Sequence, residues 1–476
     1  MNTADSRPDF PDWLGPVLVK ELRQGLRSRI FAAAFYLAQG LMILSVALNL
    51  SAVAASDIPQ PSLLALLDGV FWLLIAIPLL FLMPFRGFGA LHSEIKTRTL
   101  ELVFLTRLTA WRIAAAKWGA IVLQTVLLLC AVLPYVMLRY FLGGVDLLDD
   151  LQKVFFLFVL SAVLTAATIA MSPFESKLVR ALFVVAMLFG LQFILGGVLA
   201  WMAVGRVAGS AVAGPAWQMY LGGFLFIVPL VILALEFAAS RIAPLAENHA
   251  IRKRLLAFVV LGIGGITAAL VPDLEWGFVL GLAFCAPVIV DALIGNQQPV
   301  KSIYAPFLRH GRPGEIAAGL LTPGWHSGVW FSLVAMALAG ITAFFSGNLH
   351  DEMSRIALVA FFGALVFPAA FVRVVMPRTA FFGGFYFGIQ CFLVVVTVMV
   401  MIISALSKEP LVLWISWIPT CAFVLAFADQ IPSGQRDLVF SLVALGTTAG
   451  FGTLIFLGWK PLRDILASMR KHPAVP

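Results

Sequence analysis

The chain has 476 residues, of which 61% are hydrophobic and only 12% are charged. Soluble domains carry about 25% charged residues, so the composition excludes a soluble enzyme and predicts an all-α polytopic membrane protein. The formal net charge of +8 would suggest nucleic acid as the partner of a soluble chain. In a membrane protein the excess of Lys and Arg reports topology instead, and we expect no nucleic-acid partner.

The first 30 residues are polar and basic, and they lack the apolar core and small-residue cleavage site of a signal peptide. Between residues 13 and 30, leucine or isoleucine recurs every four residues while basic side chains occupy another face. This pattern predicts a basic amphipathic helix within residues 1–30, at the cytoplasmic interface of the membrane. Its residues of interest are Lys20, Glu21, Leu22, Arg23 and Arg27. The alternative is that it only anchors the first span against anionic lipid.

Thirteen apolar runs follow, and each is a candidate for a spanning helix of about 20 residues. They lie near residues 31–52, 64–85, 117–141, 154–172, 182–204, 219–239, 256–271, 277–295, 326–346, 356–376, 380–404, 411–429 and 438–458. The first six runs predict a six-span domain, residues 31–240, with a cytoplasmic segment at 86–117. The others predict a second membrane domain of six or seven spans, residues 241–459, followed by a basic tail at 460–476.

Charge sets the expected orientation. With the N-terminus in the cytoplasm, 23 Lys and Arg residues fall in inside segments and 5 in outside segments, which satisfies the positive-inside rule. The exception is the tail, residues 460–476, which would lie outside if all thirteen runs crossed. We expect that one of the last three runs is re-entrant or peripheral, which gives twelve spans and a cytoplasmic tail. The alternative is thirteen spans and a tail that breaks the rule.

The segment 86–117 is the longest predicted cytoplasmic connection of the first domain. Charged and aliphatic residues alternate from Glu94 to Thr106. This predicts a short, exposed helix that breaks near residues 106–109 and restarts into the third span.

This segment resembles the one by which permeases of the ABC-2 type meet their ATPase. In that family a Glu precedes a Thr-Leu-Glu-Leu-Leu type sequence, a Thr-containing break and a Lys that opens the third span. The residues in those places here are Glu94, Thr99, Leu100, Glu101, Leu102, Thr106 and Lys117, while Arg98 and Leu108 replace the usual glycine and proline. The N-terminal Lys20-Glu21-Leu22-Arg23 is similar to the family's motif before its first span. The resemblance covers residues 12 to about 240.

The resemblance implies a permease subunit of an exporter, driven by a separate ATPase subunit and working in a dimeric assembly. In this interpretation Glu94, Arg98 and Glu101 set the electrostatic register against the ATPase. The side chains that fill its groove are Ile95, Leu102 and Phe104. An ordinary interfacial helix that only connects two spans is the alternative.

The chain lacks the motifs of an ATPase. It contains no Gly-Lys dipeptide and therefore no phosphate-binding loop ending in Gly-Lys-Ser/Thr. ATP is expected on the partner subunit, and no cofactor is expected in this chain. Four cysteines without a CxxC pair and six scattered histidines indicate neither a zinc site nor a metalloenzyme. We expect a transport subunit that is not an enzyme.

Two other functions compete with this hypothesis. A scaffold or assembly protein of an envelope complex would suit spans that contain few polar residues. An ion-coupled carrier would need a titratable group near the membrane midplane, and Asp291 is the best candidate for such an intramembrane acid. In all three cases we expect an integral protein of the bacterial cytoplasmic membrane.

Prolines and glycines are abundant inside the predicted spans, as at Pro78, Pro84, Gly264 and Pro368. Small residues allow helices to pack closely, and proline leaves a carbonyl that a neighbouring helix can satisfy. We expect most of these positions to serve packing rather than hinge motion.

Overall fold

The structure is a computed structural model. It describes residues 15–55, 61–96, 108–142, 147–174, 184, 216–244, 246–270, 276–296, 299–347, 349, 351–377, 379, 381–407 and 411–471. All regular elements of these residues are helices, which confirms the all-α class. The chain divides into two compact units, Met1–Ala243 and Pro244–Pro476.

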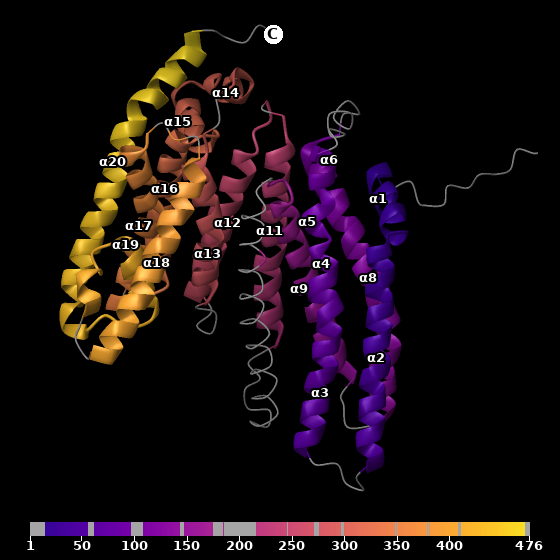
Figure 1. Cartoon of the computed structure of the whole chain (residues 1–476). Coiled ribbons are helices and arrows are strands. Elements are labelled where there is room, and N and C mark those ends of the chain that lie inside the picture. Colours follow the sequence, from indigo (N-terminus) through magenta and orange to yellow (C-terminus); the bar gives the residue numbers. More distant parts are fainter. Residues whose placement is uncertain are drawn as a thin grey trace, which may run out of the picture. The chain divides into compact units, whose positions relative to one another are not determined.

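The first unit is built from long helices and one broken helix (Figure 1). Its elements are α1 (Pro16–Leu26), α2 (Arg29–Ala55), α3 (Pro61–Ala76), the π-helix η1 (Ile77–Leu82), α4 (Met83–Phe85), α5 (Gly87–Ala90), α6 (His92–Lys96), α8 (Ala110–Leu142), α9 (Leu147–Met171) and α11 (Ala216–Ile242).

The second unit contains a helical hairpin outside its long helices. Its elements are α12 (Ala250–Leu270), α13 (Trp276–Ile294), α14 (Lys301–Leu308), α15 (Gly311–Leu321), α16 (Trp325–Phe345), α17 (Glu352–Val375), α18 (Phe382–Ser407), the 3-10 helix η3 (Leu411–Trp414), α19 (Pro419–Phe427), the 3-10 helix η4 (Ser433–Gln435) and α20 (Arg436–Lys471).

Eleven helices of the described residues are long and apolar enough to cross a membrane. The predicted run 182–204 lies outside the described residues, apart from Val184. The predicted run 411–429 is not among the eleven, because it folds as η3, a turn and the nine-residue α19. At about 1.5 Å per residue, α19 is about 14 Å long and too short for a hydrocarbon core of about 30 Å. From the charge distribution we expected one of the last three runs not to cross, and 411–429 is the one of the three without a helix of spanning length.

The C-terminal part of α20 packs against the hairpin of α14 and α15. Ile465, Leu466 and Met469 of α20 contact a small core formed by Ile303, Tyr304 and Ala318. Burial raises the pKa of the Tyr304 phenol, so this hydroxyl stays neutral. The basic tail therefore begins at the same end of the second unit as the connection 296–325 (Figure 1).

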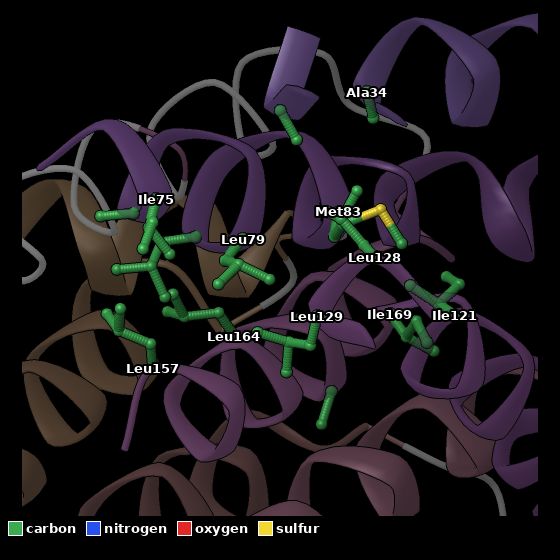
Figure 2. Close-up of a cluster of buried hydrophobic side chains, with 14 of the residues drawn as sticks. Ala34, Ile75, Leu79, Met83, Ile121, Leu128, Leu129, Leu157, Leu164 and Ile169 are labelled. Carbon is green, nitrogen blue, oxygen red and sulfur yellow. The ribbon is translucent and has the colours of Figure 1, made fainter. Parts of the chain in front are cut away.

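The core of the first unit is a continuous apolar layer between α2, α3, η1, α8 and α9. Figure 2 shows its side chains from α3, η1 and α4 packing against α8 and α9. The residues labelled there are Ala34, Ile75, Leu79, Met83, Ile121, Leu128, Leu129, Leu157, Leu164 and Ile169. In lipid, such packing holds helices together mainly through close contact, because the surrounding hydrocarbon is equally apolar.

The second span is longer than expected and departs from a regular α-helix. Its candidate span runs from Leu67 to Lys96, whereas the sequence predicted a span that ends near residue 85 and a cytoplasmic connection from residue 86. Leu91 is fully buried, and Ser172 Oγ of the α9 end accepts the backbone N–H groups of Leu91 (2.8 Å) and His92 (3.0 Å). A Cβ on Gly87 would lie 2.2 Å from Thr168 Oγ1. Residues 87–91 are thus packed against α9, and the helical run continues beyond the predicted end of the span at residue 85.

Pro84 of the second span leaves one carbonyl without a backbone donor, and α9 satisfies it. In the π-helix the N–H of Met83 donates to the carbonyl of Pro78, five residues back. In the same register the carbonyl of Leu79 would need a donor on Pro84, which has none. Ser161 Oγ donates to the Leu79 carbonyl (2.6 Å), and Thr168 Oγ1 donates to the Pro84 carbonyl (2.7 Å). The expected satisfaction of freed carbonyls by a neighbouring helix is confirmed here.

The second unit uses the same device at Pro368 of α17. This proline cannot donate to the carbonyl of Ala364, four residues earlier. Gln390 Nε2 of α18 donates to that carbonyl instead (2.8 Å), and Tyr386 Oη donates to the next carbonyl, that of Leu365 (2.9 Å). Elsewhere in this unit, glycines serve packing, since a Cβ on Gly264 of α12 would lie 2.4 Å from the Gly277 carbonyl oxygen of α13.

The Gln390 hydrogen bond gives a prediction with an internal check. Gln390→Leu should lower stability by about 1–2 kcal/mol, because it leaves a buried carbonyl without a donor. In a Pro368→Ala background residue 368 can donate to Ala364, so the same substitution should cost clearly less. The measurement is unfolding of the four proteins of this double-mutant cycle in mixed micelles.

The matched control is Thr420→Val, which removes only the hydroxyl that donates to Gln390 Oε1 (3.0 Å) and leaves the Ala364 bond in place. An equal cost of Gln390→Leu in both backgrounds would contradict the assignment.

Candidate functional site

Lys117 of α8 joins two other helices through a buried ion cluster. Its Nζ lies 3.0 Å from Glu21 Oε1 of α1 and 2.8 Å from Glu94 Oε1 of α6. The Lys117 side chain is only 5% exposed, and the two carboxylates are 20% and 19% exposed. Three residues that carry the sequence resemblance therefore meet at one point, although the outer two, Glu21 and Lys117, are 96 positions apart. We call them the Lys117 cluster.

The Lys117 cluster has the properties of a rigid joint. A single ammonium group faces two carboxylates in a site from which most water is excluded, so the loss of the ammonium would leave two partly buried negative charges. An ion pair in such surroundings is screened by salt far less than an exposed one. The position of α6 is therefore tied to α8 and α1 through one side chain.

Arg86 fixes the junction between α1 and α2 next to this cluster. It donates from Nη2 to the Gly25 carbonyl (3.3 Å) and to Ser28 Oγ (3.2 Å), and from Nη1 to the side-chain carbonyl of Gln124 in α8. A Cβ on Gly25 would lie 2.0 Å from Gln124 Nε2, so a larger residue at position 25 would displace the Gln124 side chain from its present place. The sequence analysis counted Arg86 only as an inside charge and missed this contact.

The remaining residues of α1 divide as the amphipathic pattern predicts. Leu22 is buried, whereas Lys20, Arg23 and Arg27 are exposed. Leu26 is also exposed, because a four-residue repeat advances about 40° per step around an α-helix and leaves the buried face by its end.

The predicted ATPase-coupling residues are described in part. Ile95 of α6 is partly buried and packs on the core of the first unit, so it is a packing residue as well as a groove candidate. The other predicted residues lie outside the described residues: Arg98, Thr99, Leu100, Glu101, Leu102, Phe104 and Thr106.

A second ion cluster lies at the other end of α8. Arg139 Nη2 lies 2.5 Å from Asp68 Oδ1 of α3, and Arg139 Nη1 lies 3.9 Å from Asp150 Oδ2 of α9. Lys153 Nζ pairs with Asp149 Oδ2 (2.7 Å) and Asp150 Oδ1 (3.3 Å). We call these residues the Arg139 cluster. Its two cations also lie over aromatic rings, Arg139 over Phe71 and Lys153 over Trp72, which favours them further.

The two clusters bracket an uncharged stretch of α8. Residues 118–138 contain no Asp, Glu, Lys or Arg, and at about 1.5 Å per residue the step from Lys117 to Arg139 covers about 33 Å. That length matches the hydrocarbon core of a bilayer, about 30 Å. Each cluster therefore falls near one edge of the hydrocarbon, where three helices of the unit carry charge.

Asp291, the candidate intramembrane acid, is paired. It forms an ion pair with Lys253 in the first turn of α12, and it lies one turn before the end of α13. The adjacent Arg254 donates to the Leu320 carbonyl and to Ser327 Oγ (3.1 Å), and its guanidinium lies 5.4 Å from the Phe331 ring centroid. This geometry gives Asp291 a role in holding helix ends together.

Comparison with known protein families, curated proteins and solved structures finds no match. Among the residues that the structure describes, no group of His, Cys, Asp and Glu is placed to hold a metal ion.

The Lys117 cluster predicts a specific effect of Lys117→Met. The substitution keeps the apolar stem but removes the charge between Glu21 and Glu94, so α1 and α6 should loosen by up to about 3 kcal/mol, a reduced value because water reaches both carboxylates. Hydrogen–deuterium exchange of the α1 and α6 amides should accelerate by up to about 100-fold.

The matched control is Lys20→Met, the same change at an exposed position of α1, which should leave the exchange rates unchanged. Adding Glu94→Gln to Lys117→Met should recover part of the protection, because one unpaired charge is removed. Equal exchange in the Lys117→Met and Lys20→Met proteins would show that the cluster does not hold these helices.

Proposed function

We propose that this chain is the permease subunit of an ATP-driven exporter of the ABC-2 type, driven by a separate ATPase subunit at its cytoplasmic face. The observation that carries the proposal is the Lys117 cluster. Glu21, Glu94 and Lys117 occupy family-like positions in three separate sequence segments, and all three side chains belong to one ion cluster. A mechanical connection between a coupling segment and the spanning helices is what such a permease needs.

The proposed mechanism uses α6 as the input and α8 as the output. A nucleotide-dependent movement of the ATPase would displace the segment that begins at α6. Because Lys117 ties α6 to α8 and α1, the displacement would reach the third span and the α1–α2 junction together. Packed helices transmit such displacements as rigid bodies.

The proposal places the protein in a bacterial cytoplasmic membrane with α1, α6 and the tail inside, and it includes a dimeric assembly. Support for the orientation comes from the distribution of Lys and Arg: when 411–429 does not cross and the tail lies inside, 26 fall in inside segments and 6, now including Arg436, in outside ones. The end of α20 and the hairpin α14–α15 pack together, as this orientation requires of two inside segments.

Orientation is tested by cysteine labelling in a cysteine-free background. A maleimide that cannot cross the membrane should label Lys96→Cys, an exposed position, only from the cytoplasmic side. Asp437→Cys, exposed at the start of α20, should be labelled only from outside. Labelling of position 96 from outside would overturn the proposal.

Coupling is tested by reconstituting the full chain with candidate ATPase subunits in nanodiscs and measuring association and ATP hydrolysis. Lys117→Met should leave association intact and lower the stimulation of hydrolysis several-fold, because the connection to the spans is lost. Glu101→Lys with Leu102→Asp should abolish association, because these positions are predicted to contact the ATPase.

The controls match each variant in chemistry. Lys20→Met controls for Lys117→Met, and Asp437→Lys with Leu438→Asp places the same two changes on an exposed acid–leucine pair at the predicted outer side. If both site variants behaved as their controls, the permease proposal would fail. Substrate accumulation driven by a proton gradient without ATP would favour an ion-coupled carrier instead.

A further inference from the structure

The end of α20 extends beyond the part of the helix that can lie in hydrocarbon. Residues 438–459 contain no charged residue and cover about 33 Å at ~1.5 Å per residue, which is enough to cross the bilayer. Trp459 ends this stretch, is 55% exposed and lies edge-to-face against Trp330 (5.9 Å between ring centroids). Exposed tryptophans typically mark the level of the lipid headgroups. The helix from Lys460 onward therefore lies at or beyond that level.

The last three turns of α20 are amphipathic. Ile465, Leu466 and Met469 pack against the core of the hairpin α14–α15, and Leu462, on the same side of the helix, is buried. The basic residues Lys460, Arg463 and Arg470 recur at i, i+3 and i+10, which places them on one other face, and all three are exposed. The helix end is thus held by apolar contacts and by the Arg470–Glu315 ion pair (3.2 Å). Lys460 and Arg463 lie on the exposed side of the helix, away from this apolar core.

The hairpin contributes more exposed cations at the same end of the unit. Lys301 lies on α14, Arg309 in the turn and Arg312 on α15, and all three are exposed. Together with the three cations of α20 they form what we call the basic collar, and the carboxylates beside them are those of Glu315 and Asp464. The excess of positive charge fits an anionic partner.

Exposed apolar side chains among these cations favour a membrane surface as that partner. Ile316 of α15 is 68% exposed, one turn after Arg312, and Trp459 precedes Lys460 directly. Segments that combine basic residues with exposed apolar or aromatic residues lie in the headgroup region, where both can be satisfied. A surface that only faced an acidic soluble protein would not need these apolar groups.

We propose that the basic collar, residues Lys301, Arg309, Arg312, Lys460, Arg463 and Arg470, binds the phosphates of anionic phospholipid headgroups. Each exposed cation near an anionic surface contributes a factor of about five in affinity. The lipid would hold the hairpin and the end of α20 against the membrane. This inference does not depend on transport or on an ATPase.

The test measures lipid retained by the full chain in detergent. The protein is incubated with phosphatidylglycerol or with zwitterionic phosphatidylcholine, passed over a size-exclusion column, and the bound lipid is quantified by mass spectrometry. The wild type should retain more phosphatidylglycerol than phosphatidylcholine, and the difference should shrink between 0.1 and 0.5 M salt. The variant Arg312→Gln, Lys460→Gln, Arg463→Gln should retain at least about tenfold less phosphatidylglycerol.

The matched control keeps the charge and changes the side chain: Arg312→Lys, Lys460→Arg, Arg463→Lys should retain the lipid as the wild type does. These variants leave Arg470 and its pair with Glu315 intact, and their unfolding temperatures without lipid should equal that of the wild type. Undiminished phosphatidylglycerol retention by the glutamine variant would overturn the proposal. An equal loss of phosphatidylglycerol from the charge-keeping variant would also overturn it. If the glutamine variant lost a co-purifying protein but no lipid, the basic collar would be assigned to an acidic protein partner instead.

Discussion

The buried contact between one ammonium group and two carboxylates at Lys117 is the interaction on which the architecture of the first unit depends. Ion pairs inside a membrane protein are costly to form and costly to break, so they persist only where helices hold the partners in place. Here the partners come from α1, α6 and α8. Arg86 also connects α1 with α8, because it donates to the Gly25 carbonyl and to the side-chain carbonyl of Gln124. The three segments therefore behave as one body.

Both units solve the same problem where proline interrupts a spanning helix. Ser161 of α9 donates to the carbonyl of Leu79, and Gln390 donates to the carbonyl of Ala364. In hydrocarbon an unsatisfied carbonyl costs several kcal/mol. Each of these donors therefore stabilises the helix at its proline. At these prolines the helix backbone is thus held by hydrogen bonds from a neighbouring helix.

The fold class and most of the spans could be predicted because run length and hydrophobicity act locally along the chain. The run 411–429 was ambiguous since it is as apolar as its neighbours. Pro419, at the first position of α19, starts a new short helix after the turn, and the fate of such a helix depends on its packing against α17. The extension of the second span to Lys96 was missed because charges near Glu94 suggested exposure, whereas their partner lies more than 20 residues further along the chain.

The site was predictable only where a resemblance supplied its residues. Glu21, Glu94 and Lys117 were selected in this way, but no spacing in the sequence states that they touch. The Arg139 cluster had a local signal that was not used. Asp68 interrupts an apolar run, and a charge in such a run predicts a partner of opposite sign on a neighbouring helix. The identity of that partner depends on which helices are neighbours, which only the folded structure supplies.

The two clusters together restrict how α8 can move. A shift of α8 along its own axis would draw either the Lys117 cluster or the Arg139 cluster toward the hydrocarbon and would separate ion pairs with α3 or α9. Both effects are unfavourable by several kcal/mol. Tilting about the apolar core costs less, because it keeps each cluster near its edge of the bilayer and preserves the contacts with Glu21 and Glu94. In the mechanism proposed above, a force applied to α6 would therefore change the tilt of the bundle rather than slide one helix.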